Sequence, residues 1–426
     1  MTKLGVLIPE FPGQTHAFFM REKAAMEALG AEVILLSTQP AKSQNGAAKH
    51  AWAESAAKET TYLVPSKKNS WAMAKALLTT NPLKILLCLY RLLFQSQASL
   101  KGKLKLLALI PIAAYLKARC QQLAIAHLHV HSAATTAELA MIARWLGGPT
   151  YSITLHGHVS NYGDNQSQKW RHATFGIAIT HELLAELKGI AGEANLPPME
   201  VAPMGVDTQT FQRTTPYRAP TKDQVTQLVT CARLHFYKGQ DILLDVVKQL
   251  NADGYPTHLT IYGDIDSDPS SARFRDSLLA TISADGLQDH VTMAGSVCES
   301  VLQSEYEQAS IFCLASLAEG LGVAYMEAMS MEVPVIGARS PGVESLIDHG
   351  RTGYVVERTA DAFIETIKHL IDHPDQTCAT AQAGRQAICR AFHSGISAEK
   401  ILANTTHLSF TQNSVGRFTP RIIHPR

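Results

Sequence analysis

The sequence predicts an α/β protein made of two doubly wound domains, each built on a parallel sheet. The chain has 426 residues, more than a single hydrophobic core usually serves. Short apolar runs alternate with helix-length segments along most of it, which is typical of βα units. A polar stretch at 208–227, with Pro216 and Pro220, interrupts this pattern. We interpret that stretch as the linker between the two domains.

The first half begins with a βαβ unit. Strands are expected at Leu4–Ile8 and Glu32–Leu36, around a helix from about Ala17 to Leu29 that Gly30 ends. The remaining strands of this sheet are expected at Ala126–Val130, Tyr151–Leu155, Gly176–Ile179 and Met199–Pro203.

The second half repeats the alternation of strands and helices. One of its expected helices is Gln240–Asn251. Its strands are expected at Leu228–Ala232, His258–Tyr262, Val291–Ala294, Ile311–Ala315 and Pro334–Gly337.

Composition excludes several classes of protein. Lys plus Arg is 38 and Asp plus Glu is 37, so the overall charge shows no nucleic-acid footprint, and we expect no nucleic-acid partner. The seven cysteines form no Cys-x-x-Cys pair, which suits a reducing cytoplasm and argues against a zinc site. Residues 1–9 resemble a short strand and lack the features of a secretory signal. We therefore expect no export.

A long segment of the first half is basic and apolar. Between Thr60 and Ala137 there is no Asp or Glu, and the ten cations are Lys67, Lys68, Lys75, Lys84, Arg91, Lys101, Lys103, Lys105, Lys117 and Arg119. No apolar run reaches the roughly 18 residues needed to span a bilayer. A pair of basic apolar helices within 60–125, lying on an anionic membrane surface, is the favoured interpretation. The alternative is helices packed on the first sheet with their Lys side chains in water.

The clearest functional signal is a pair of acids eight residues apart, Glu319 and Glu327. They lie between the expected strand at Ile311–Ala315 and a segment of helical composition at Val323–Met331. A helix N-terminus at the carboxyl end of a parallel strand favours a phosphate. Carboxylates beside a phosphate are better suited to accept hydrogen bonds from sugar hydroxyls. The pattern indicates a nucleotide sugar, and the alternative is a pair of ordinary solvated acids.

Two cations follow the first strand of the second half. Arg233 and Lys238 lie after the expected strand end at Ala232, near the carboxyl edge where the acidic loop also lies. Together with the helix start after Gly320 they can neutralise a departing diphosphate without a metal. The alternative is a solvated basic loop.

These segments, taken together, resemble the family 4 retaining glycosyltransferases over nearly the whole chain. The Glu-x7-Glu element is the most specific part of the resemblance. The matching segments are Pro203–Asp207 followed by Phe211, Arg233 and Lys238, Gly263–Asp264, Gly295–Val297, Glu319–Met329 and Pro341–Ser345.

The resemblance implies a GT-B architecture, in which two Rossmann-like domains face a central cleft. It implies an N-terminal acceptor-side domain at 1–210, a C-terminal nucleotide-sugar-binding domain at 211–397, and a segment at 398–426 that packs back on the first domain. In the family, the positions of Arg233 and Lys238 hold the donor diphosphate. Glu327 would then bind the ribose hydroxyls, and Glu319 would contact the transferred sugar.

Further donor contacts follow from the same resemblance. The implied backbone contacts to sugar and phosphates are Gly320, Leu321, Gly322 and Val323, and those bordering the base are Gly295 and Val297. In the first domain, Gly13 would approach the donor in a loop that departs from the family's common Gly-Gly form. That loop is similar to the branch with exopolysaccharide and colanic-acid-type transferases.

Histidines mark the strands of the first half that lead to the expected cleft. His156 matches the family's cleft histidine and is expected to contact the donor sugar. His158 and Asn161–Asp164 are candidates for acceptor contacts. His127, His129 and His131 alternate along one strand face. We interpret these three as polar lining and expect no metal site.

The expected function is therefore hexose transfer with retention, from a nucleotide sugar, with UDP-hexose favoured. No cofactor is expected beyond this co-substrate. The acceptor is expected to be a polyprenyl-linked saccharide of a bacterial polysaccharide pathway, or a glycolipid precursor such as diacylglycerol. The enzyme would be cytoplasmic and peripheral on the inner face of the cell membrane. The alternatives are a transferase for a soluble small-molecule acceptor and a nucleotide-sugar epimerase.

Overall fold

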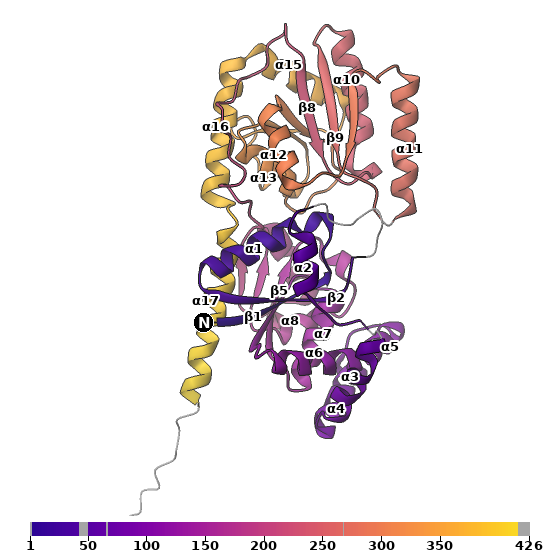
Figure 1. Ribbon diagram of the computed structural model, residues 1–426, viewed down its shortest axis with the longest axis vertical. Coiled ribbons are helices and arrows are strands. Elements are labelled where there is room, and N and C mark those ends of the chain that lie inside the picture. The colour runs from indigo at the N-terminus through magenta and orange to yellow at the C-terminus, as the bar shows by residue number, and fades with distance from the viewer. Residues whose placement is uncertain (1, 42–49, 65–66, 267, 416–426) are drawn as a thin grey trace, which may run out of the picture.

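A computed structural model describes residues 2–41, 50–64, 67–266 and 268–415. Two parallel sheets form the centres of two α/β domains, which lie one above the other in Figure 1. The first sheet has seven strands in the order β3-β2-β1-β4-β5-β6-β7. Their bounds are β1 Thr2–Glu10, β2 Ala31–Gln39, β3 Thr61–Tyr62, β4 His127–Val130, β5 Thr150–Leu155, β6 Gly176–Ala178 and β7 Met199–Val201.

The second sheet has six strands in the order β10-β9-β8-β11-β12-β13. In both sheets the chain begins at a central strand, adds strands on one side and then crosses to the other side. The crossing lies between β1 and β4 in the first sheet and between β8 and β11 in the second. Ligands bind at such points in open α/β sheets. The predicted fold class is confirmed. The bounds of the second set are β8 Thr226–Cys231, β9 Thr257–Tyr262, β10 Val291–Gly295, β11 Ile311–Leu314, β12 Val335–Ala338 and β13 Tyr354–Val356.

Several strand limits differ from the sequence-based expectation. β8 begins at Thr226, so the last two residues of the expected linker belong to the sheet. Two short strands at sheet edges, β3 and β13, were not predicted. Runs of two and three residues carry almost no period-2 signal, so neighbouring strands decide whether they pair.

Helices cover both sheets. The first domain contains η1 Gln14–His16, α1 Ala17–Ala28, α2 Ala53–Glu59, α3 Lys67–Leu78, α4 Pro82–Tyr90, η2 Arg91–Gln95, α5 Leu100–Ala108, α6 Ile110–Gln122, α7 Thr135–Trp145, η3 Val159–Tyr162, α8 Gln166–Arg171, α9 His181–Ala191 and η4 Glu193–Asn195. The rest of the chain contains η5 Phe236–Lys238, α10 Gln240–Ala252, α11 Pro269–Ala284, α12 Glu299–Gln308, α13 Val323–Ser330, α14 Pro341–Glu344, α15 Ala360–Asp372, α16 Pro374–Ala391 and α17 Gly395–Val415.

The basic apolar segment forms four helices and a π-helical turn, so the expectation of a single helical pair was wrong. Asn81 caps α4 by accepting a hydrogen bond from the Leu83 amide at 2.9 Å, and Pro82 occupies the first turn. An N-cap residue followed by proline favours the start of a helix. The chain therefore begins a new helix, α4, after α3 has ended. Pro111 likewise lies in the first turn of α6. A backbone N–H at that position has no partner within the helix, so proline loses no helical hydrogen bond there.

The C-terminal helix returns to the first domain. Ala398 and Ile401 of α17 are buried in an apolar cluster with residues of the first sheet and α1, and α17 lies beside α1 in Figure 1. Asn404 of α17 donates to Glu200 of β7, which also pairs with Lys400. Residues 416–426 of the expected C-terminal segment lie outside the described residues.

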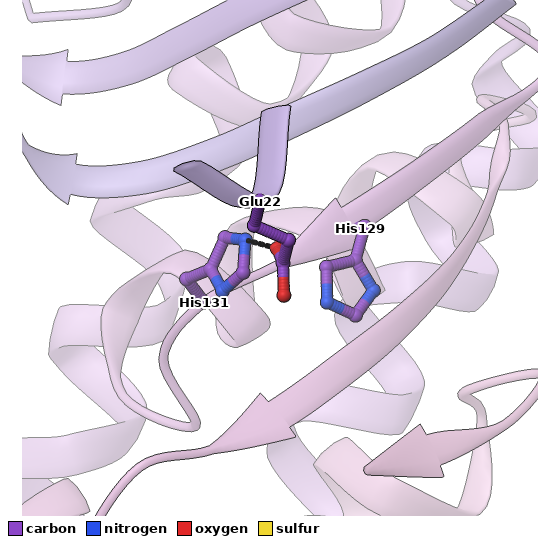
Figure 2. A group of neighbouring side chains, drawn as sticks. All are labelled: Glu22, His129 and His131. Carbon is purple, nitrogen blue, oxygen red and sulfur yellow. Dashed lines mark ion pairs between the residues drawn. The ribbon is translucent and has the colours of Figure 1, made fainter. Parts of the chain in front are cut away.

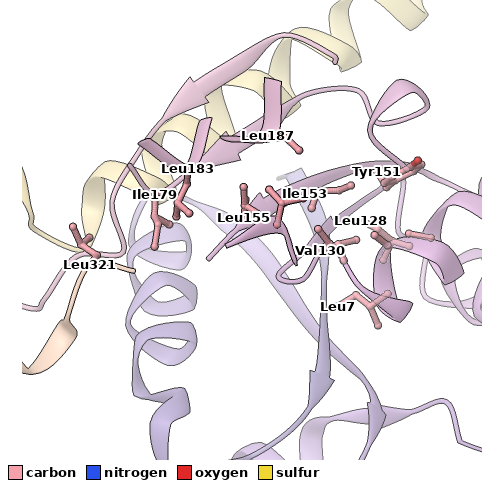
Figure 3. Close-up of a cluster of buried hydrophobic side chains, with 14 of the residues drawn as sticks. Leu7, Leu128, Val130, Tyr151, Ile153, Leu155, Ile179, Leu183, Leu187 and Leu321 are labelled. Atoms are coloured by element: carbon pink, nitrogen blue, oxygen red, sulfur yellow. The ribbon is translucent and has the colours of Figure 1, made fainter. Parts of the chain in front are cut away.

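Apolar packing also joins the two domains. The cluster in Figure 3 contains Leu7, Val130 and Leu155 from the first sheet and reaches Leu321 of the second domain, which lies near Ile179. Leu321 is 2 % exposed. Because Leu321 follows Glu319 by two residues, this contact holds the acidic loop against the first domain.

Among the described residues, no single helix is long and apolar enough to cross a membrane. One bent pair, Asn69–Leu78 with Pro82–Gln95, meets the length and composition criteria only when the two segments are taken together, and they meet at 95°.

Candidate active site

A cavity of about 870 Å³ lies between the carboxyl ends of the two sheets. This volume is within the range of small-molecule sites. It brings together all but one of the residues predicted to be catalytic or to bind the donor. Those lining it are Gly13, His156, Arg233, Lys238, Val297, Glu319, Gly320, Leu321, Gly322, Val323 and Glu327. Gly295 is not among the lining residues, whereas Ser296 and Val297 are.

Lys238 and Glu319 form an ion pair in the cavity wall. Lys238 Nζ lies 2.7 Å from Glu319 Oε1, and the two side chains are 14 % and 11 % exposed. The loops that carry them are bonded together, because the Leu317 amide donates to Tyr237 O at 2.7 Å. The sequence placed these residues on neighbouring loops and did not predict that they pair. A charged ligand that binds either side chain must therefore displace the other member of this ion pair.

Arg233 lies at the outer part of the cavity. Its Nη1 is 3.0 Å from Asp266 Oδ2, and its side chain is 49 % exposed. An exposed ion pair of this kind contributes little stability. The guanidinium is accordingly available to a ligand that offers more negative charge than one carboxylate.

The loop before α13 brings backbone groups to the cavity. Gly322 is the N-cap residue of α13 with φ 77°, a conformation that glycine adopts at little cost. A Cβ at Gly320 would lie 3.0 Å from the His156 carbonyl oxygen, so a larger residue there would force this loop or the first domain to shift. The unpaired amides at the start of α13 favour an anion in the cavity.

Glu327 is buried against an arginine from the other domain. Arg21 Nη2 of α1 lies 2.8 Å from Glu327 Oε1 and 2.7 Å from Glu299 Oε2, and its guanidinium lies over the Phe211 ring at 4.9 Å. Burial raises the pKa of Glu327, and Arg21 opposes that rise. Burial lowers the pKa of Arg21, but the carboxylates of Glu327 and Glu299 outweigh burial and raise this pKa above the usual value.

The sequence offered no signal for the Arg21 contact, because Arg21 lies within an unremarkable helix. Glu327 was expected to bind ribose hydroxyls; one of its oxygens is already used by Arg21. The Nε and Nη1 atoms of Arg21 are buried without a hydrogen-bond partner. Arg21, Glu299 and Glu327 all line the cavity, so this charge cluster forms part of its wall.

The Gly13 loop contributes a second bond between the domains. The Gly13 amide donates to His16 Nδ1 at 2.8 Å, and Gln14 Nε2 donates to Val297 O at 2.8 Å. The Val297 carbonyl, which was expected to border the base, is thus engaged by the first domain. Burial lowers the pKa of His16 to about 4, so its ring is neutral near pH 7.

His156 lines the cavity and is the end of a chain of buried polar groups. Its Nε2 lies 3.0 Å from His131 Nδ1, and its Nδ1 lies 2.9 Å from Met204 Sδ. His131 Nε2 in turn lies 2.9 Å from Glu22 Oε2. Burial lowers the pKa of His156 to about 3.

The other histidines of the first half have different surroundings. His127 and His129 are buried and bonded to hydroxyls of β5, and neither lines the cavity. His158 is half exposed and pairs with Glu186 at 2.9 Å, and the side chain of Asp164 accepts from the Ser99 amide. His158 and Asn161–Asp164, expected to contact the acceptor, are not among the residues that line the cavity.

The fold and the cavity define a class: this chain has the GT-B fold of glycosyltransferases. Sucrose-phosphate synthase from Thermosynechococcus elongatus superposes with a TM-score of 0.69 at 15 % identity, over 96 % of this chain and 100 % of that one. HepE from Anabaena, in complex with UDP and glucose, gives 0.69 at 14 % identity over 95 % and 99 %.

Sequence similarity narrows the class. Residues 226–373, most of the second domain, match the family model described as glycosyl transferases group 1.

Two curated relatives have named activities. The chain is 27 % identical, over 60 % of its length and 69 % of the relative, to the GDP-mannose-dependent α-(1-6)-phosphatidylinositol monomannoside mannosyltransferase of Mycobacterium tuberculosis. It is 26 % identical to the putative colanic acid biosynthesis glycosyltransferase WcaL of Salmonella typhimurium, over 55 % and 57 % of the two chains.

Proposed function

We propose that the protein transfers a hexose, with retention, from a nucleotide sugar to a lipid-associated acceptor at the inner face of the cell membrane, without a metal. The observation that carries the donor half of this proposal is the arrangement of charge in the cavity. The cations Arg233 and Lys238 and the N-terminus of α13 line the same cavity as the carboxylates Glu319 and Glu327. Cations suit a diphosphate, and carboxylates suit hydroxyls of ribose and hexose.

The ion pair of Lys238 with Glu319 supplies a route for partner exchange. A donor diphosphate carries more charge than the Glu319 carboxylate and would take over the Lys238 ammonium. Glu319 would then be free to accept hydrogen bonds from the hexose. Lys238, Arg233 and the α13 amides would stabilise the charge that builds on the diphosphate as the sugar–oxygen bond breaks. Attack from the same face would let the departing phosphate take the proton of the acceptor hydroxyl.

A panel of nucleoside diphosphates and nucleotide sugars tests the donor site by thermal shift. UDP-hexose is the expected donor, and GDP-mannose is its competitor because the mycobacterial relative uses it. A ligand at 100 times its dissociation constant raises the free energy of unfolding by about 2.7 kcal/mol.

Glu327→Gln should remove part of that stabilisation, whereas Glu357→Gln, on an exposed second-domain side chain paired with Arg339, should leave it intact. Absence of stabilisation by every member of the panel contradicts the proposal. Conversion of the sugar with no acceptor present would instead identify an epimerase.

An exposed apolar surface supports the membrane half of the proposal. It is carried by α3, α4, η2 and α5, which project from the first domain at the end remote from the second in Figure 1. Exposed cations on the same elements include Lys75, Lys84 and Lys101. The exposed large apolar side chains are Trp71, Leu78, Leu83, Leu86, Leu87, Tyr90, Leu93, Phe94, Leu100 and Leu104. Apolar side chains among cations suit the interface of an anionic bilayer.

Replacing exposed apolar residues tests this surface. The double variant Leu86→Ser/Phe94→Ser should bind anionic vesicles at least about 10-fold more weakly than the wild type, because burial of one such side chain contributes about 1.5–3 kcal/mol. Vesicle sedimentation measures the effect. The control is Ile190→Ser/Leu279→Ser, since these side chains are also exposed but lie on α9 and α11. Equal binding of both variants argues for a soluble acceptor.

A further inference from the structure

A buried polar chain leads from α1 to the cavity wall through Glu22, His131 and His156. Glu22 and His131 are 6 % and 4 % exposed, and Figure 2 shows the His131 ring facing the Glu22 carboxylate, with His129 beside them. The rings of His131 and His156 stack at a centroid distance of 5.3 Å, and Phe19 packs against both. The chain is thus enclosed by aromatic side chains.

The position of one proton on His156 follows from its neighbour Met204. A thioether sulfur carries no hydrogen and can only accept. His156 Nδ1 is 2.9 Å from Met204 Sδ, so this nitrogen carries the hydrogen. A neutral His156, the form that its lowered pKa of about 3 favours, then has an unprotonated Nε2 that must accept.

The proton on His131 follows in turn. His156 Nε2 accepts, so His131 Nδ1, 3.0 Å away, must be the donor. The other nitrogen of His131 lies 2.9 Å from a Glu22 oxygen in an ion pair, although the two atoms do not meet hydrogen-bond geometry. A ring lone pair would be repelled by the carboxylate at that distance. His131 Nε2 therefore also carries a hydrogen. With hydrogens on both nitrogens the ring would carry a positive charge. It is paired with Glu22, whose pKa is lowered to about 2 because the effect of His131 outweighs that of burial.

We propose that Glu22 and His131 are positioning residues that hold His156 as an Nδ1–H donor toward the cavity, where it donates to a hydroxyl of the transferred sugar. Met204 also lines the cavity, and a hydroxyl oxygen is a better acceptor than a thioether, so a sugar would displace that contact. If His131 lost the proton on its Nδ1 atom, His156 would donate from Nε2 to that nitrogen. His156 Nδ1 would then present a lone pair, and not a hydrogen, to the cavity. The identity of the ligand rests on the proposed function, whereas the protonation pattern does not.

The same cluster also has the composition of a metal site, because ligand atoms of Glu22, His129 and His131 lie within 4.8 Å of one another. The hydrogen bonds argue against that use. His129 Nδ1 and Nε2 are each 2.8 Å from a hydroxyl, of Ser152 and of Thr154, and a metal would have to break one of these bonds as well as the contact of Glu22 with His131.

Histidine NMR tests the protonation pattern without any substrate. In protein labelled with ¹⁵N-histidine, the His131 signals, assigned by their loss in His131→Asn, should show two protonated ring nitrogens at about pH 7. The His156 signals should show a neutral ring protonated at Nδ1. Glu22→Gln should convert His131 to a neutral ring and move the His156 proton to Nε2.

The matched control is Glu138→Gln, because Glu138 is an equally buried carboxylate of the first domain that pairs with Lys105 instead. It should leave both histidines unchanged. A neutral His131 in the wild-type protein overturns the proposal, whatever the enzyme transfers.

Kinetics test the link to the reaction. Once the panel above has identified the donor, Glu22→Gln should lower kcat/KM for it about 10-fold, the worth of one hydrogen bond to a sugar hydroxyl. In a His156→Ala background the same change should have no further effect. Additive losses would show that Glu22 acts only through stability and overturn the positioning role. An imidazolium at His131 combined with no donor binding would instead overturn the proposed function alone.

Discussion

Lys238→Ala is expected to lower turnover about 100-fold or more. Its ammonium lies 2.7 Å from Glu319 in a largely buried wall, where a fixed charge stabilises a departing diphosphate far better than it would in water. Removal of one such preorganised group costs about 2.7–4 kcal/mol of transition-state stabilisation. The variant also leaves Glu319 without its partner, which adds repulsion toward the phosphates. Steady-state kinetics with saturating donor measures the loss.

Lys248→Ala is the matched control for this experiment. Lys248 lies on α10 of the same domain and pairs with Asp285 at 2.9 Å, but it is 55 % exposed and is not among the lining residues. Both variants remove one positive charge, so an effect of net charge would appear in both. Turnover of Lys238→Ala within a few-fold of the wild type would refute the role assigned to Lys238.

Arg21→Ala should have the largest effect on stability. The substitution leaves Glu327 and Glu299 facing each other without a cation, and Glu327 is 7 % exposed. Removing one partner of a buried ion pair typically costs about 3–5 kcal/mol. The loss of the guanidinium over Phe211 adds to it. Urea denaturation should show a lower midpoint.

Two further variants make this result specific. Arg275→Ala removes an arginine whose ion pair with Asp276 is exposed, and should change stability by no more than about 0.5 kcal/mol. Adding Glu299→Gln to Arg21→Ala should recover part of the loss, because it removes one of the two repelling carboxylates. No recovery would show that packing, and not charge, is what Arg21 contributes.

Strand-forming runs and linker composition were sufficient to predict two doubly wound domains. β11, Ile311–Leu314, is buried on both faces, and such strands are continuous apolar runs that stand out in a sequence. The path of the chain between 60 and 125 was less predictable. Two of the breaks between its helices depend on the capping residue Asn81 and on Pro82 and Pro111. The effect of each proline depends on which helix it begins.

For the site, the sequence by itself determined which loops line the cavity. Arg233, Lys238, Glu319 and His156 follow strands of parallel sheets, and the carboxyl ends of such strands meet at one edge, so pattern alone places these residues there.

Only the tertiary structure decided how the side chains pair. Lys238 meets Glu319 within one domain, Arg21 reaches Glu327 from the other, and Glu22 pairs with His131 behind His156. These partners are separated by tens to hundreds of residues. Their pairing depends on how strands and helices come together within each domain and, for Arg21, on how the two domains face each other. No local period or spacing in the sequence predicts that arrangement.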